Sequence, residues 1–453
     1  MKYRKPTYSF VRLATAVAFF SLLLALPNDT YSQTKRHNNK EKQEQKAKRT
    51  YIVDDESCGC ELFFVDGIQT IRHNERFGFK LEDGTVIVEP KYMFVDKFTD
   101  GYCIVYTDYE HCGLIDRTGR EIVPTTYRNV YYPSDGMVLV MQDNNTFGFY
   151  DTSGRMVIEP CYFSASSFNE GKAVALLETD SGEYKYGYID KSGKTVIQPA
   201  YDYAYAFSEG YATVVKNELN GMIDSTGREV MPCTYLEISV VSDGRFFVAD
   251  KNSHKVAMYS TKIKPVTGFV YDKILNHSEG YYTFQRNGKE GYLNKKGKEC
   301  FGMHDHAYSF HNGFACVGEN GHFGIINNKG KFILPAEYDN SDIYQDQYIF
   351  HEGLALVEKK GRYGFVNTKG EIVIPLIYEG ARHCTEGLIP AKRGNMWGYI
   401  DKEGNDAIEF VFDQASTFEW GRAEVVYHDK THKINPYGEC VKDCKTFPKI
   451  WHK

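Results

Sequence analysis

Cysteine is the residue type whose spacing in this sequence most directly suggests covalent chemistry. The chain has 11 cysteines, and two close pairs, Cys58 with Cys60 and Cys440 with Cys444, flank all the others. In an oxidising compartment some of these thiols should form disulfides. A bridge between the two pairs would fasten the ends of a ring, for about 2–5 kcal/mol of stability. A local bridge between Cys440 and Cys444 is the alternative.

Three histidines, His304, His306 and His311, lie close together in the sequence. His304 and His306 alternate, so on one strand they would share a face and offer a pair of metal ligands. Variation at the surface of one divergent segment is the simpler interpretation. The paired Cys-x-x-Cys spacing of a zinc site is absent, and the sequence predicts neither a metal nor any other cofactor.

Catalytic motifs are also absent. The sequence has no Gly-x-Ser-x-Gly, His-Glu-x-x-His or phosphate loop, and its Cys and Ser residues have no His and Asp partners at characteristic spacings. We therefore predict that the protein is not an enzyme. The observation that would favour an enzyme is a cluster of His, Asp and Glu, outside any repeat pattern, at one end of the fold.

The elements that must position these side chains are copies of one segment of about 35 residues, best preserved in residues 184–214. A glycine, usually after an aromatic residue, marks nine copies, and Val256 and His432 replace it in two eroded copies. Successive copies are separated by 33 to 40 residues, which gives eleven copies. The nine glycines are Gly78, Gly113, Gly148, Gly187, Gly221, Gly291, Gly324, Gly364 and Gly398.

A hairpin is predicted at the start of each copy. Three residues after the glycine stands an Asp or Asn, such as Asp190 or Asp401, and three residues later a second glycine follows. In a type I turn the first side chain bonds to the turn's own amides, and the glycine takes the left-handed conformation. A row of these carboxylates could bind calcium, but Asn stands in four copies, so we interpret them as turn residues.

Two further strands are predicted after the turn. The first is a continuous apolar run that ends at a proline, as in Ile372 to Pro375, and we expect it to be buried on both faces. A Tyr and an acidic-Gly corner follow, such as Glu209-Gly210, and then a strand with alternating apolar residues, such as Ala212 and Val214. Residues 64–67 read as the tail of one more, incomplete copy.

The composition agrees with strands and indicates export. The chain of 453 residues has 35 Tyr, 29 Phe and 40 Gly, which favour strands and turns. Four basic residues precede an apolar run over residues 13–26. Pro27 and small residues follow the run. This pattern is typical of a cleaved signal peptide, here residues 1–32, because the run is shorter than the roughly 20 residues of a spanning helix. A membrane anchor is the alternative.

Charge is distributed unevenly along the chain. Residues 33–50 are rich in Lys and Arg, so we expect residues 33–57 to form a basic, disordered linker. The rest of the chain is more acidic than the formal net charge of −6 for the whole sequence. Such a balance argues against a nucleic-acid partner, because phosphates require a positive surface.

The repeat resembles the WG repeat family of bacteria, also called KWG repeats. The closest segments are MWGYIDKEG from Met396, YGYIDKSGKTVIQP from Tyr186 and RYGFVNTKGEIVIP from Arg362. The Trp that names the family survives at Trp397 alone. The resemblance covers nearly all of the chain after residue 60, and it implies an all-β array of three-stranded units that act as interaction modules in secreted or envelope proteins. It brings no catalytic residues.

We therefore expect an all-β array over residues 58–446, built from about eleven three-stranded repeats, with a tail at 447–453. Stacking such units buries apolar strands that one unit cannot bury alone. The units would form one β-propeller-like toroid or two, since eleven exceed the usual four to eight blades. An open β-solenoid is the alternative.

Function is expected where the copies depart from the repeat. Aromatic residues outside the pattern are candidate contacts for a partner, and two insertions, at residues 180–182 and 342–347, should lie on a rim. We predict an exported envelope protein that binds a protein partner or acts as a scaffold, with glycan binding as the alternative. The candidate aromatic residues are Tyr131, Tyr132, Tyr203, Tyr205, Tyr281, Tyr344, Tyr348 and Trp420.

Overall fold

The computed structural model describes residues 64–65, 67–339, 349–442, 444 and 447. The chain divides into residues 1–51 and 52–453, and all described residues belong to the second unit. They form strands in eleven antiparallel sheets, and the described residues contain no α-helix. We number the sheets 1 to 11 along the chain.

The bounds of the strands are as follows. Sheet 1 has β1 (Phe64–Val65), β2 (Ile68–His73), β3 (Arg76–Leu81) and β4 (Val86–Tyr92); sheet 2 has β5 (Phe94–Val95), β6 (Tyr102–Tyr106), β7 (Cys112–Asp116) and β8 (Glu121–Tyr127); sheet 3 has β9 (Asn129–Val130), β10 (Met137–Met141), β11 (Phe147–Asp151) and β12 (Met156–Tyr162). Sheet 4 has β13 (Lys172–Glu178), β14 (Tyr184–Asp190) and β15 (Thr195–Tyr201); sheet 5 has β16 (Tyr203–Ala204), β17 (Tyr211–Lys216), β18 (Leu219–Asp224) and β19 (Glu229–Tyr235); sheet 6 has β20 (Glu237–Ile238), β21 (Arg245–Ala249), β22 (Val256–Ser260) and β23 (Lys264–Pro265).

The second half of the array continues in the same way. Sheet 7 has β24 (Lys273–Ser278), β25 (Tyr281–Arg286), β26 (Lys289–Asn294) and β27 (Glu299–His304); sheet 8 has β28 (His306–Ala307), β29 (Phe314–Glu319), β30 (His322–Asn327) and β31 (Phe332–Tyr338); sheet 9 has β32 (Leu354–Lys359), β33 (Arg362–Asn367) and β34 (Ile372–Tyr378). Sheet 10 has β35 (Gly380–Ala381), β36 (Ile389–Arg393), β37 (Met396–Ile400) and β38 (Asp406–Phe412), and sheet 11 has β39 (Gln414–Ala415), β40 (Ala423–Tyr427), β41 (Lys430–Ile434) and β42 (Cys440–Lys442).

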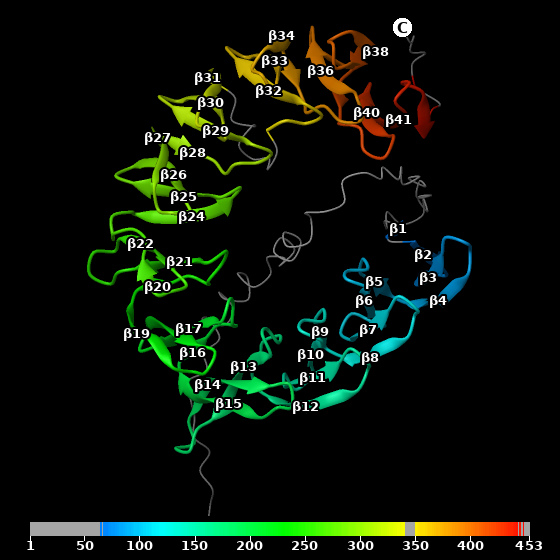
Figure 1. The fold of residues 1–453 in the computed structure, drawn as a ribbon. Helices are drawn as coiled ribbons and strands as arrows, with labels where there is room; N and C mark the ends of the chain where they lie inside the picture. The colour runs from blue at the N-terminus through cyan, green and yellow to red at the C-terminus, as the bar shows by residue number, and fades with distance from the viewer. Residues whose placement is uncertain (1–63, 66, 340–348, 443, 445–446, 448–453) are drawn as a thin grey trace, which may run out of the picture. The chain divides into compact units, whose positions relative to one another are not determined.

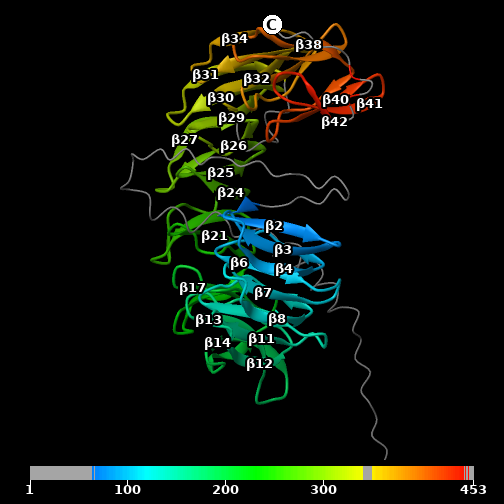
Figure 2. The ribbon, with the colours of Figure 1, turned by 90° about the vertical axis from the view of Figure 1, so that its right-hand side faces the viewer.

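Each sheet is a meander in which strands adjacent in sequence are adjacent in space. Figures 1 and 2 show this as sheets of nearly uniform colour. Four short antiparallel strands in meander order are also the unit from which propeller blades are made. The all-β fold with eleven repeats is thereby confirmed. The principal contacts between described strands lie within a sheet or between consecutive sheets, and the choice between rings and a solenoid stays a prediction.

The boundary of the structural unit differs from the boundary that the sequence suggested. The strand after each acidic-Gly corner pairs with the glycine strand that follows it, as β17 pairs with β18. The predicted third strand of one copy therefore belongs to the next sheet. Residues 64–65, read as the tail of an incomplete copy, are the first strand of a complete sheet. Sequence periodicity fixes the length of a repeat but not the point at which the sheet begins.

A fourth strand was missed in most sheets. It is the first strand of the sheet and has two residues in all of these sheets but sheet 7; an example is Tyr203–Ala204, which pairs with the strand after the corner. A two-residue strand carries no alternation for a sequence pattern to reveal. In sheets 4 and 9 no such strand is assigned among the described residues, although Ala165 still forms an isolated bridge to Ala175.

The expectation about buried strands was wrong in detail. The continuous apolar run forms the fourth strand, and in sheet 9 its Ile372 is 56% exposed whereas Ile374 is fully buried. The strand that seemed to alternate is the second, and there Ala212, Thr213 and Val214 are all buried. The strand after the corner is therefore more deeply buried than the strand that carries the apolar run, even in sheet 9, where β32 lies at an edge of the described sheet.

The repeat glycine is required because the backbone of the next strand passes close to it, and not because its own φ is positive. A Cβ atom on Gly364 would lie 2.6 Å from the carbonyl oxygen of Ile374, which is shorter than any real contact. The fourth strand bulges at this point. The register also corrects the position of one eroded copy. In sheet 6, Val248 is the residue that would pair with the repeat glycine, and it pairs with Ala257 and not with Val256.

The predicted turn is confirmed. Oδ1 of Asp190 accepts the backbone N–H of Ser192 at 2.9 Å and that of Lys194 at 3.0 Å, and Gly193 has φ of 83°. In the equivalent turns, hydrogen bonds from Ser153 and Thr226 lower the pKa of Asp151 and Asp224 to about 2. These carboxylates serve the turn, as the sequence indicated.

Candidate functional site

The acidic-Gly corners connect consecutive sheets. Each corner is a two-residue turn with both residues at positive φ, and in six corners the carboxylate accepts the N–H of the corner glycine in the next sheet. Glu209 bonds Gly244 in this way at 2.8 Å, and Glu279 bonds Gly313 at 2.8 Å. The same contact joins Asp135 to Gly171, Glu170 to Gly210, Glu352 to Gly387 and Glu386 to Gly421. These corner acids are therefore structural.

The opposite end of each sheet carries the hairpin between its second and third strands, and we call this end the loop rim. In seven sheets the hairpin is a two-residue turn with both residues at positive φ, such as Asn217-Glu218, which is the geometry of a type I′ turn. An acid after the preceding fourth strand supports it: Asp202 accepts the N–H of Asn217 at 2.6 Å. Sheets 2, 3, 4 and 6 have longer loops instead, at residues 107–111, 142–146, 179–183 and 250–255.

Exposed aromatic side chains gather at the longer loops of sheets 2 and 4. Tyr109 is 81% exposed, and its ring centroid lies 5.5 Å from that of Phe94. Phe163 and Tyr184 form an equivalent pair, with ring centroids also 5.5 Å apart, and both are about half exposed. The supporting acid of the short hairpins is replaced near these pairs by Met93 and Phe163. These four aromatics are available to a partner.

The three loops of sheets 2 to 4 are also acidic. They contain no Lys or Arg, and five carboxylates in them are exposed. The exposed acids are Asp108, Glu110, Asp143, Asp180 and Glu183. We refer to loops 107–111, 142–146 and 179–183, together with Phe94, Phe163 and Tyr184, as the acidic aromatic rim.

Contacts between neighbouring loops hold this rim together. Arg76 of sheet 1 donates to the carbonyl of Thr107 at 3.1 Å. His111 has Nδ1 3.1 Å from Asp108 and Nε2 3.5 Å from Asp143 of sheet 3. The hydrogen bonds to Asp108 and then to Asp143 raise the pKa of His111. With both ring nitrogens facing carboxylates, His111 is a cross-link between loops and is poorly suited to act as a general base.

The predicted aromatic residues of the sequence are dispersed, and several are used in packing. Tyr132 lies in the core of sheets 2 and 3, and its hydroxyl donates to the carbonyl of Lys97 at 3.1 Å. Tyr131 next to it is 39% exposed, and burial raises its pKa. Tyr203 stacks edge-on against Tyr186 and Tyr205. These rings support contacts between sheets more than they form one surface.

The remaining candidates lie elsewhere. Tyr281 packs on Phe301 and Phe310. Trp420 is 71% exposed and occupies the acidic position of the last corner, so the residue that bonds the next sheet elsewhere is here an aromatic. Tyr344 and Tyr348, and the insertion at 342–347, fall outside the described residues. The insertion at 180–182 lies on the loop rim, where the sequence placed it.

The four aromatics of the acidic aromatic rim were missed by the sequence reasoning. Tyr109 and Tyr184 are in or beside loops that lengthen the interval between the corner and the repeat glycine. The interval of 39 residues before Gly187 was noticed, but the loop before Gly113 was hidden by an average interval of 35. The number of residues between each corner and the next repeat glycine, instead of between successive repeat glycines, would have revealed both longer loops.

The histidine pair is not a metal site. His304 ends β27 of sheet 7 and His306 begins β28 of sheet 8, so the prediction that they share one strand was wrong. His304 is buried, with Nδ1 3.0 Å from Glu319 and Nε2 3.0 Å from the carbonyl of Phe301. Within the described ranges, no three His, Cys, Asp or Glu side chains converge as metal ligands would.

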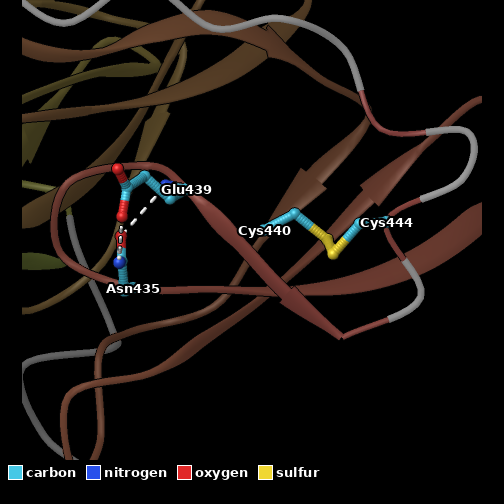
Figure 3. Close-up of a disulfide and its surroundings, with 4 residues drawn as sticks. All are labelled: Asn435, Glu439, Cys440 and Cys444. Atoms are coloured by element: carbon cyan, nitrogen blue, oxygen red, sulfur yellow. Dashed lines mark hydrogen bonds between the residues drawn. A yellow bond between two sulfur atoms is a disulfide. The ribbon is translucent and has the colours of Figure 1, made fainter.

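The local disulfide is formed between Cys440 and Cys444, whose Cα atoms are 5.6 Å apart (Figure 3). A bridge from either residue to Cys58 or Cys60 is therefore wrong; those two cysteines fall outside the described residues. The turn before the bridge is held by Asn435, which accepts the N–H of Glu439 at 3.0 Å and donates to its carboxylate at 2.8 Å (Figure 3). His432, at the glycine position of sheet 11, is buried against Phe447.

Among the described residues, no helix has the length and hydrophobicity that crossing a bilayer requires. No curated protein matches the chain in sequence.

Solved structures with some similarity include a eukaryotic initiation factor, with 12% identity over 66% of this chain and 93% of that chain and a TM-score of 0.33. BamB from Moraxella catarrhalis shares 11% identity over 67% of this chain and 95% of its own, with a TM-score of 0.22. PorZ from Porphyromonas gingivalis shares 8% identity over 81% and 67%, with a TM-score of 0.20. Scores this low carry no argument about this chain.

The repeats themselves match a known family. The family described as WG containing repeat matches seven segments, at residues 77–109, 113–145, 147–178, 186–219, 323–363, 363–397 and 397–430. The unmatched stretch between them holds sheets 6 and 7, where the repeat glycine is lost at Ala257, yet these sheets keep the same topology. The matched segments cover more than half of the sequence, and the chain belongs to the WG repeat family.

Proposed function

We propose that this WG repeat protein is an exported binding or scaffold protein of the cell envelope, and that it recognises a protein partner through its loop rim. The observation that carries the proposal is the separation of roles between the two ends of the sheets. Corner acids such as Glu209 are used to join sheets, whereas the departures from the repeat are exposed on the loop rim at residues 107–111 and 179–183.

Export is supported by the sequence at the start of the chain. Basic residues and the apolar run over residues 13–26 have the order of a signal peptide. Formation of the Cys440–Cys444 bridge agrees with an oxidising compartment. Among the described residues seven further cysteines are unpaired thiols, and burial raises the pKa of Cys103 and Cys316 above the ordinary range, so these two act as core side chains.

A catalytic role is not part of the proposal. Asp108, His111 and Asp143 form the kind of cluster that an enzyme would need, but each imidazole nitrogen faces a carboxylate. No Cys or Ser at this cluster is bonded to the imidazole in the described contacts, so it lacks a nucleophile activated by His.

Glycan binding is the second candidate, and the exposed rings of Phe163 and Tyr184 are the observation that favours it, since flat rings stack on sugars as well as on peptide groups. Affinity capture from envelope extracts with the mature protein, in parallel with a glycan array, separates the two. We expect a protein that co-purifies in near-stoichiometric amount. A specific glycan signal with no protein partner would reverse the ranking.

A further inference from the structure

The loop rim changes character along the array. In each sheet that keeps the repeat glycine, one residue pairs with that glycine across the ladder, and the residue two positions after this partner lies close to the hairpin. This residue is Arg286 in sheet 7, Lys359 in sheet 9 and Arg393 in sheet 10. The same position in sheets 2, 3 and 4 holds Thr107, Gln142 and Leu177. At this position the chain therefore supplies a cation in sheets 7, 9 and 10 and no cation in sheets 2, 3 and 4.

Where the chain supplies the cation, it places it over an aromatic ring and beside a carboxylate. Arg393 lies 4.0 Å from the ring centroid of Phe410 and donates to Asp406 at 2.6 Å. Arg286 lies 5.7 Å from the ring of Tyr271 and donates to Glu299 at 2.8 Å. A cation held in this way gains from both the ring quadrupole and the carboxylate charge.

The acidic aromatic rim presents the same two components, while the nearby cations Arg76 and Arg128 donate to the oxygen atoms of Thr107 and Asn145. Tyr109 and Tyr184 are exposed rings, and Glu110, Asp180 and Glu183 are exposed acids in the same loops. No Lys or Arg lies within these loops. The contact of His111 with Asp143 links the loops of sheets 2 and 3, and in sheet 4 the ring of Tyr184 packs on Phe163.

We propose that the acidic aromatic rim of sheets 2 to 4 binds a Lys- or Arg-rich segment of a partner protein, whose cations stack on Tyr109 and Tyr184 and pair with the surrounding carboxylates. This inference rests on the proposed function and specifies the chemistry of its partner. Charge complementarity selects a basic segment over an acidic one, and exposed tyrosines are typical of the residues that dominate binding at interfaces.

The test uses the mature protein and a fluorescent ten-residue peptide that alternates Lys and Gly, with the same peptide carrying Glu instead of Lys as the ligand control. We expect binding of the Lys peptide, at least about fivefold weaker in 0.5 M salt because exposed charges are screened, and no binding of the Glu peptide. Equal binding of both peptides would overturn the proposal.

Variants locate the contact. The double variant Tyr109→Ala/Tyr184→Ala should weaken binding about tenfold, and so should Glu110→Gln/Asp180→Asn/Glu183→Gln. Tyr437→Ala is the matched control, because Tyr437 is 72% exposed but lies in the last turn of sheet 11, at the other end of the sheets; it should bind as the parent does. All of these side chains are exposed, so circular dichroism should show an unchanged fold.

A failure of the basic-segment proposal can be distinguished from a failure of the proposed binding function. A protein partner captured from the extract, together with no binding of the Lys peptide, would contradict the basic segment and leave the binding role intact. Binding of cellohexaose or chitohexaose that is lost in the double tyrosine variant, with no peptide binding, would assign the same rim to a glycan and overturn this inference.

Discussion

The repeat glycine, which nine of the eleven sheets keep, leaves no room for a side chain. The neighbouring fourth strand passes so close to Gly364 that a Cβ atom would overlap the backbone of Ile374 and Leu376. Gly353, at the corner of the same sheet, has φ of 88° and open space around it. The two glycines are therefore needed for different reasons, which one pair of substitutions can separate.

Gly364→Ala should lower the free energy of unfolding of sheet 9 by about 3 kcal/mol or more, because backbone must move to admit the methyl group. Gly353→Ala should cost about 1–2 kcal/mol, the strain of a left-handed alanine. Hydrogen exchange of β32 to β34 measures both in the same sheet. Equal losses, or a larger loss for Gly353→Ala, would show that close approach is not the reason for the repeat glycine.

His111 is the titrating residue of the acidic aromatic rim. Its contacts with Asp108 and then Asp143 favour the charged imidazolium, so its pKa should be above the ordinary 6.5. A raised pKa means that the cross-link between loops is fully present below the unfolded pKa of about 6.5 and is lost as the pH rises through the folded value.

An NMR titration of the His111 ring follows this transition. Asp143→Asn should lower the measured pKa while leaving the loop intact, because Asp108 keeps its own bonds to the backbone of Glu110 and His111. A pKa at or below 6.5 in the parent protein would mean that the contact with Asp143 does not persist in solution.

At the scale of elements, the corner turn is the connection that the repeat pattern preserves between sheets. Burial would raise the pKa of Asp135, but its bonds to Lys191 and to the N–H of Gly171 outweigh burial and lower it. The contact is therefore made by the ionised carboxylate and weakens as the pH falls through that lowered value. In the last described corner Trp420 stands in place of the acid, so this carboxylate contact is not made there.

Glu209→Ala should remove one such connection, between sheets 5 and 6, at a cost of about 0.5–1 kcal/mol, since the group is exposed and screened by water. Glu209→Gln keeps an acceptor oxygen and should cost less. Faster hydrogen exchange at Gly244 in the Ala variant is the expected sign. An unchanged exchange rate at Gly244 in both variants would argue that the corners do not hold neighbouring sheets together.

Most of the array was predictable from the sequence because the repeat residues have local causes. Asp190 and Gly193 define their turn within five residues, and the count of eleven copies follows from the spacing of the repeat glycines and the two positions that replace them. Strand burial was not predictable, because side chains within one continuous apolar run differ in exposure: Ile372 is exposed whereas Ile374 is buried. Periodicity alone cannot show that the strand after one corner belongs to the next sheet.

The candidate surface was predictable only in part, for a related reason. The insertion at residues 180–182 changes the repeat interval and was found, whereas Tyr109 lies in a loop whose added length is offset elsewhere in the repeat. Tyr132 and Tyr203 are outside the pattern in sequence but inside the packing between sheets. An aromatic residue that departs from a repeat is thus not always a surface residue.

At the scale of the whole molecule, the account makes one central claim: the sheets are the scaffold and the longer loops of the rim carry the binding. Replacing residues 108–110, 143–145 and 180–182 each by Asn-Gly would give sheets 2 to 4 the two-residue hairpin that sheets 7 and 8 already have. The sheets should keep their strands, because the exchanged residues lie beyond the ladder.

The most direct test is the amount of partner that this loop-exchanged protein captures from an envelope extract, relative to the parent, at equal folded concentration. We predict that thermal unfolding changes little and that capture falls to the level of a control without bait. Undiminished capture by the loop-exchanged protein would contradict the account, because binding would then reside in the repeats themselves.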